Sequence, residues 1–155
     1  MMEDEAPTFL YFDVRHAIDT HDWIIGHSGG LTGIKDIGQI ESPIEHIKND
    51  WYYPELEDKL THLVYSINKN HAFNDGNKRS SIALGAYFLE LNGFGYLVHH
   101  FVLEMENIAV WVADNVIDKD LLAKLIYSIL YEDDYSESLK LELFRAIQGS
   151  QNLSS

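Results

Sequence analysis

The side chains best suited to chemistry lie in nine consecutive residues, from His71 to Arg79, with the sequence HAFNDGNKR. His71 is the group in this segment that can accept a proton near neutral pH, so it is a candidate general base. Asp75 offers a hard oxygen ligand of the kind that Mg²⁺ takes when it is shared with nucleotide phosphates. Lys78 and Arg79 add two cations, and Gly76 lets the backbone approach a ligand closely. This combination suits phosphoryl transfer.

The segment joins two predicted helices, which explains why it could bind an anion. Apolar residues at helical spacing from Leu56 to Ile67 predict the first helix, and Lys78 to Leu91 the second. The N-terminus of a helix presents unpaired N–H groups and favours an anion. Its dipole disfavours Lys78 and Arg79 there unless an anion lies between them. From the residues alone, a plain turn followed by a solvated helix face stays open as well.

The segment resembles the Fic motif, H-x-F-x-[D/E]-G-N-[G/K]-R. Upstream, Gly29 to Ser42 resembles the glycine-rich segment of Doc-type (death-on-curing) toxins, and the resemblance extends from about Asp13 to Asn115. The matching positions of the motif are His71, Phe73, Asp75, Gly76, Asn77, Lys78 and Arg79.

The resemblance implies an enzyme that transfers a phosphate-containing group from a nucleotide, ATP or a related one, to a hydroxyl of a target protein. It implies that His71 deprotonates that hydroxyl, that Asp75 holds Mg²⁺ against the phosphates, and that Phe73 anchors the loop in the core. The implied catalytic residues are His71 and Arg79, and the implied nucleotide-binding residues are Gly76, Asn77, Lys78 and Arg79.

Two positions bear on the reaction that the resemblance implies. Adenylylating Fic enzymes usually carry glycine at the position of Lys78 and a second arginine at the position of Ile82. Lys78 is similar to the Doc branch, in which the γ-phosphate is transferred, so Doc-like phosphorylation is the favoured prediction. Gly76 departs from the alanine of Doc itself. Adenylylation therefore stays open, as does a catalytically silent Fic-like binding module.

The resemblance also implies partners. It implies a toxin that is paired with a small cognate antitoxin and that modifies a target protein. In Doc that target is elongation factor Tu, which is carried over here only as an expectation. The sequence leaves open whether the chain forms oligomers.

The rest of the chain predicts a single all-α domain over residues 1–155, a Fic-like helical bundle with a core at about 13–131. Asp13 is the expected N-cap of a first helix that stops at Gly29-Gly30, and Pro54 is expected in the first turn of the helix that contains Leu56. Short extended pieces at Phe9–Phe12 and Phe94–Val98 leave room for a short β-hairpin flap. The other expected helices are one through Ile40, Ile44 and Ile47, and three at about 102–112, 119–131 and 138–147.

Composition excludes several classes of protein. The 25 Asp and Glu exceed the 11 Lys and Arg, for a formal charge of −14, so direct nucleic-acid binding is disfavoured. The absence of cysteine excludes disulfides and thiolate chemistry. Met1 to Pro7 lacks the pattern of a signal peptide, and no apolar run approaches the roughly 20 residues of a membrane span. A cytoplasmic protein without membrane contact is expected.

Four further patterns are weaker. The pair His21-Asp22 occurs in HD phosphohydrolases, but without the other ligands we expect a core or surface histidine. His99-His100 is expected to be structural or exposed. Ser138 and Glu142 partly match an inhibitory Fic helix pattern, although an ordinary amphipathic helix is favoured. The aromatic run from Trp51 to Tyr53 lies near the position where a Fic flap would align a target, and packing is its simpler role.

Overall fold

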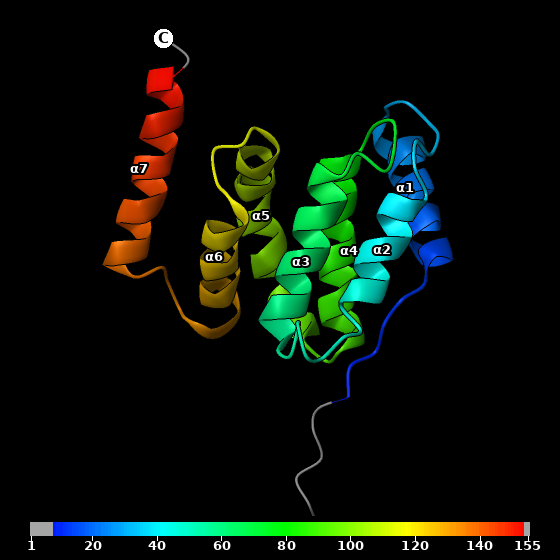
Figure 1. The fold of residues 1–155 in the computed structure, drawn as a ribbon, viewed down its shortest axis with the longest axis horizontal. Coiled ribbons are helices and arrows are strands. Elements are labelled where there is room, and N and C mark those ends of the chain that lie inside the picture. The colour runs from blue at the N-terminus through cyan, green and yellow to red at the C-terminus, as the bar shows by residue number, and fades with distance from the viewer. Residues whose placement is uncertain (1–7, 154–155) are drawn as a thin grey trace, which may run out of the picture.

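The computed structural model describes residues 8–153, and in that range the chain is all-helical (Figure 1). The prediction of an all-α Fic-like bundle is confirmed. The described part contains no β-strand, only an isolated antiparallel bridge between Ile34 and Phe73. The elements are α1 (Val14–Ser28), α2 (Gly38–His46), α3 (Leu56–Lys69), α4 (Asn77–Leu91), the 3₁₀ turn η1 (Gly95–Leu97), α5 (Val98–Ala113), α6 (Lys119–Tyr131) and α7 (Glu137–Leu153).

Local signals set several helix ends where they were predicted. Asp13 is the N-cap of α1, and its carboxylate accepts a hydrogen bond from the backbone N–H of His16 at 2.8 Å. The helix ends before Gly29, which has a φ of 85°. Residues 119–131 form α6 as predicted. The expectation about a signal peptide in residues 1–7 lies outside the described residues.

Other boundaries differ from the prediction. The prediction of a β-hairpin flap is wrong for the described residues, because Gly95–Leu97 is a 3₁₀ turn and α5 begins directly after it, at Val98. A short extended piece there would leave its backbone groups without a partner strand. Pro54 precedes α3 instead of lying in its first turn, since Glu55 is the N-cap and forms a capping box with Asp58. Helix α7 continues to Leu153, well past the expected end at residue 147.

The core forms where α4 lies against α1, α3 and α5. Leu60, Leu63 and Ile67 of α3 are completely buried. Gly85 permits this packing, because a Cβ there would lie 2.8 Å from Cγ2 of Val64 and 3.0 Å from Cζ of Phe101. By contrast, α7 contacts little besides α6 and stands at the edge of the bundle (Figure 1).

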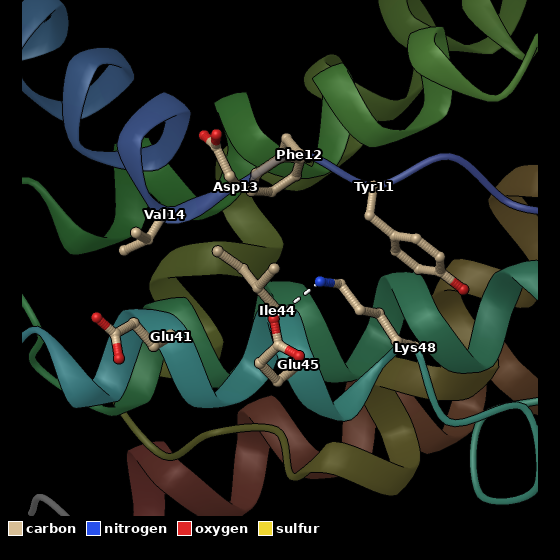
Figure 2. Close-up of a pocket in the computed structure, with 8 residues that line it drawn as sticks. All are labelled: Tyr11, Phe12, Asp13, Val14, Glu41, Ile44, Glu45 and Lys48. Atoms are coloured by element: carbon tan, nitrogen blue, oxygen red, sulfur yellow. Dashed lines mark hydrogen bonds and ion pairs between the residues drawn. The ribbon is translucent and has the colours of Figure 1, made fainter.

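The segment before α1 lies alongside α2 and is tied to the end of α4 (Figure 2). Leu10 and Asn92 exchange two hydrogen bonds, of 2.8 and 3.0 Å. A cavity of about 330 Å³ lies between residues 11–14 and α2, where Glu45 and Lys48 form an ion pair of 2.8 Å (Figure 2). The cavity lies at the N-terminal end of α1. Because the 15 residues of that helix span about 22 Å at 1.5 Å per residue, the cavity is far from its C-terminal end.

Four polar side chains join α2, α3 and α6. The Lys119 ammonium donates to Nδ1 of His62 at 2.8 Å, and the Tyr53 hydroxyl lies 3.3 Å from the same nitrogen. The proton of His62 therefore sits on Nε2, which lies 3.1 Å from Nδ1 of His46. Burial and then the charges of Lys119 and His46 lower the pKa of His62 to about 4.

This lowered pKa predicts a loss of stability in acid. The unfolded chain protonates its histidines near pH 6.5, whereas His62 in the folded chain stays neutral to about pH 4. The unfolded state therefore binds more protons in this window, and stability that is present above pH 6.5 is lost as the pH falls toward 4. Urea unfolding from pH 7 to pH 4.5 should show a smaller decrease for His62→Gln than for the wild type. If the change of stability with pH is the same in His62→Gln as in the wild type, or is reduced equally in the exposed-site control His99→Gln, the acid sensitivity does not come from His62.

Candidate functional site

The loop between α3 and α4 lies against the glycine-rich loop that follows α1, at the upper end of the bundle in Figure 1. The backbone N–H groups of Lys35 and Asp36 both donate to the carbonyl of Ala72, at 2.8 and 3.0 Å. The N–H of Asn74 donates to the Gly33 carbonyl at 3.1 Å, and the side-chain amide of Asn74 donates to the Thr32 carbonyl at 3.0 Å. The glycine-rich segment therefore holds the loop in place.

One cavity of about 460 Å³ brings together all the site residues that the sequence predicted. His71 and Lys78 are exposed in it, and Asp75 and Arg79 are half-buried. The lining residues are Asn68, His71, Asn74, Asp75, Gly76, Asn77, Lys78, Arg79 and Ala113.

The start of α4 forms the anion-binding part of this cavity. Gly76 is the N-cap and adopts the left-handed conformation, with φ 77° and ψ 17°. Since glycine has no side chain, no side chain caps the helix at this position. The N–H groups of the first turn, residues 77–79, are therefore available to an anion, which the helix dipole also favours.

Arg79 and Lys78 differ in their surroundings. The Arg79 guanidinium donates from Nη1 to the Ser28 hydroxyl at 2.6 Å and to the Gly29 carbonyl at 2.8 Å. These bonds hold the side chain across the C-terminal end of α1, where a cation is favourable. Lys78 is exposed in the same turn and forms no ion pair within residues 8–153. Ile82, at the position of the second arginine of adenylylating enzymes, packs against the core instead.

The Asp75 carboxylate is held by two backbone N–H groups. It accepts hydrogen bonds from Leu31 at 3.0 Å and from Gly76 at 2.8 Å, and these bonds keep the pKa of Asp75 below its ordinary value. Gly30 lies so close that a Cβ there would be 2.7 Å from Oδ2 of Asp75.

Among the described residues, no three His, Cys, Asp or Glu side chains cluster as metal ligands. A single ionised carboxylate beside a phosphate site nevertheless fits Mg²⁺ that arrives with a nucleotide, because this ion keeps several waters and uses one or two protein carboxylates. The site therefore suits a metal that is shared with the substrate better than a resident one.

The rest of the loop places His71 at the cavity and stabilises the backbone that follows it. His71 has a φ of 51°, in the left-handed region, and its side chain faces the cavity. The side chain of Asn77 accepts from the N–H of Phe73 at 3.1 Å and donates to its carbonyl at 3.0 Å. The amide of Asn77 is thus occupied within the loop, and its backbone N–H is what it offers to an anion. Phe73 is buried, as expected of an anchor.

Sequence reasoning missed the groups of α1 that contact this loop. Ser28 binds Arg79, and His21 is completely buried with its Nε2 2.6 Å from the carbonyl oxygen of Asp75. His21 lies at helical spacing with the buried Ala17 and Ile24, which is the signal that places it on the inner face of α1. An HD-type metal centre is not formed by the described residues.

The weaker patterns lie elsewhere. Trp51 and Tyr52 are exposed at the N-terminal side of α3, so the 14 residues of that helix, about 21 Å, separate them from His71. The favoured role of packing is wrong for Trp51 and Tyr52, which are 88% and 73% exposed, and the alternative place near the site is wrong as well. Glu142 pairs with Lys124 of α6 at 3.0 Å and does not reach Arg79, as an ordinary amphipathic helix implies. His99 and His100 are exposed, as expected.

Comparison with known proteins agrees with this fold. The model of the Fic/DOC family matches residues 11–89, about half of the chain, and the chain belongs to that family. It is 32% identical over 99 residues to a protein named Toxin Doc from Mycolicibacterium smegmatis (strain ATCC 700084 / mc(2)155), a match that covers 61% of this chain and 76% of the relative. It is 36% identical over 80 residues to Protein kinase doc of Escherichia phage P1, over 49% of this chain and 63% of that protein.

Within residues 8–153, none of the helices combines the length and the apolar character that crossing a bilayer requires.

Proposed function

We propose that this protein is a Doc-like toxin that phosphorylates a hydroxyl of a target protein, with ATP as the donor. The observation that carries the proposal is the shared cavity, in which His71 lies beside an uncapped helix N-terminus flanked by Lys78 and Arg79. The similarity to proteins named Toxin Doc and Protein kinase doc supports the same reaction. A cognate antitoxin and a place of action in the cytoplasm, where ATP is present, follow from this proposal.

The start of α4 and four side chains of the cavity have roles in this reaction. The N–H groups at the start of α4, with Lys78 and Arg79, bind the phosphates and offset the negative charge that develops in the transition state. Asp75 would hold Mg²⁺, which neutralises phosphate charge when it is bound with the nucleotide. His71 accepts the proton of the target hydroxyl, whose oxygen attacks the γ-phosphorus. The bond from that phosphorus to the bridging oxygen then breaks, and ADP leaves with the electron pair.

Lys78 is the residue that favours phosphoryl over adenylyl transfer. Its side chain occupies space that a glycine would leave open to a phosphate, and it brings a cation to the first turn of α4. With the apolar Ile82 one turn later, the site lacks the second arginine of adenylylating enzymes. A γ-phosphate bound between Lys78 and Arg79, near His71, is consistent with these two differences from adenylylating enzymes.

The test is the transfer of label from ATP to proteins of a bacterial cell extract, with γ-labelled and α-labelled ATP compared side by side. We expect label to arrive from the γ position alone, and none with the His71→Ala variant. Label from the α position would establish adenylyl transfer instead. Binding of ATP without transfer of label from either position would favour the silent binding module.

A further inference from the structure

His21 of α1 contacts the catalytic loop at two points and does not line the cavity. Its ring stacks face to face on Phe73, with ring centres 3.7 Å apart and planes 3° from parallel. Its Nε2 lies 2.6 Å from the carbonyl oxygen of Asp75. Because a carbonyl oxygen only accepts hydrogen bonds, Nε2 carries the proton and donates it.

The acceptor of this hydrogen bond belongs to a peptide unit that matters for the site. The carbonyl of Asp75 and the N–H of Gly76 are the two ends of one planar peptide group. His21 binds the carbonyl end, and the N–H end donates to the Asp75 carboxylate at 2.8 Å. Rotation of this peptide would therefore break both hydrogen bonds and leave the carboxylate held by the Leu31 N–H alone.

Contacts around Gly76 restrict the same peptide group. A Cβ at Gly76 would lie 3.4 Å from Nε2 of His21 and 3.1 Å from Cδ1 of Ile25, so α1 packs closely against this turn. Gly76 is also the N-cap of α4, and its φ of 77° sets the direction in which the helix begins. A group that fixes this peptide fixes both the Asp75 carboxylate and the first N–H groups of α4.

We propose that His21 is a positioning residue for the transfer reaction. Through its hydrogen bond to the Asp75 carbonyl, it holds the Asp75 carboxylate and the anion-binding turn in the orientation that binds a nucleotide with Mg²⁺. The inference rests on the proposed function, because it assigns His21 a role in that same site. His21 itself touches neither the nucleotide nor the target.

Two substitutions separate the hydrogen bond from the packing. His21→Phe keeps an aromatic ring against Phe73 but removes the donor, whereas His21→Gln keeps an N–H donor and loses the ring. His16→Phe is the matched control, since His16 also lies on α1 and stacks on an aromatic ring, that of Tyr87, at 4.0 Å, but does not contact the loop.

The first measurement is binding of ATP by calorimetry, with and without Mg²⁺. Partners that orient a metal ligand typically change metal affinity by about 10–100-fold. We expect His21→Phe to lose at least about 10-fold of the Mg²⁺-dependent gain in ATP affinity, and His21→Gln and His16→Phe to stay within about 3-fold of the wild type. His21→Phe that binds ATP–Mg²⁺ as the wild type does would overturn the proposal, as would equal losses in His21→Phe and His21→Gln.

The second measurement, amide hydrogen exchange of the ligand-free protein, does not depend on the reaction. His21→Phe should speed exchange at the Gly76 amide while the buried amides of α3 keep the wild-type rate. Faster exchange throughout the bundle would assign His21 a general structural role and overturn the proposal. If the wild type transfers no label but the expected binding and exchange differences appear, the proposed function fails, and the role of His21 in positioning the site for a nucleotide with Mg²⁺ stands. If label is transferred equally by the wild type and His21→Phe, the positioning role alone fails.

Discussion

Replacing His71 with asparagine is expected to lower the rate of label transfer from ATP by about 10²–10⁴-fold, the contribution of a positioned general base. Of the residues that line the cavity, His71 is the one histidine, the side-chain type suited to general base catalysis, so no neighbour can take over the proton. Asparagine is the suitable replacement because His71 has a φ of 51°, and asparagine tolerates the left-handed region better than most residues. The variant therefore removes the base and keeps the backbone.

Initial rates of transfer, measured at one fixed extract concentration, test this prediction. His99→Asn is the matched control, because it makes the same substitution at an exposed histidine outside the cavity, and it should transfer label at the wild-type rate. Thermal unfolding should place His71→Asn within about 2 °C of the wild type, since an exposed side chain contributes little to stability. Transfer by His71→Asn within about 10-fold of the wild type would exclude His71 as the base.

The candidate loop from His71 to Arg79 could be predicted from the sequence because its parts are local. His71, Asp75 and Arg79 lie in one run of nine residues between two strongly periodic helices, so their approach to one another requires only a short turn. The start of α4 at Gly76 follows from the same local chemistry. A local pattern of this kind can be recognised without knowledge of the tertiary fold.

The support of the loop could not be predicted in the same way, because it comes from residues far away in the chain. His21 and Ser28 reach the loop only after α1 packs against α4, and periodicity identifies an inner face without identifying what that face meets. Trp51 shows the converse error. It is 20 residues from His71 in the sequence, but α3 lies between the two residues and places Trp51 at the opposite end of the bundle. Two residues that are close in the sequence can therefore lie far apart in space when a helix separates them.

Lys59 is the second residue for which a large effect is expected, although lysine is a residue type that is usually exposed. Its side chain is completely buried on α3. The ammonium donates to the carbonyl of Ile47, at the end of α2, and to the Asp50 carboxylate, both at 2.6 Å. The ring of Phe9 lies 4.9 Å from the ammonium nitrogen. One buried cation thus joins α2, the turn that follows it, α3 and the N-terminal segment.

We expect Lys59→Met to lower the free energy of unfolding by about 1–3 kcal/mol, because the buried Ile47 carbonyl would lose the ammonium and keep only the long hydrogen bond of 3.4 Å from the Tyr11 hydroxyl. Methionine preserves most of the side-chain volume, so the loss would come from the Ile47 carbonyl and not from a cavity. The loss should stay below the roughly 3–5 kcal/mol of a broken buried ion pair, because the Asp50 side chain is 70% exposed and returns to water.

Lys48→Met provides the contrast that assigns the effect to burial. Lys48 lies near the same turn and pairs with Glu45 at 2.8 Å, but its side chain is 44% exposed, so its ion pair should contribute less than about 1 kcal/mol. In urea unfolding at pH 7, Lys59→Met should therefore shift the midpoint clearly while Lys48→Met shifts it little. Similar midpoints for the two variants would mean that water reaches the Ile47 carbonyl once the ammonium is gone, and that the junction of α2 and α3 depends on apolar packing instead of this buried cation.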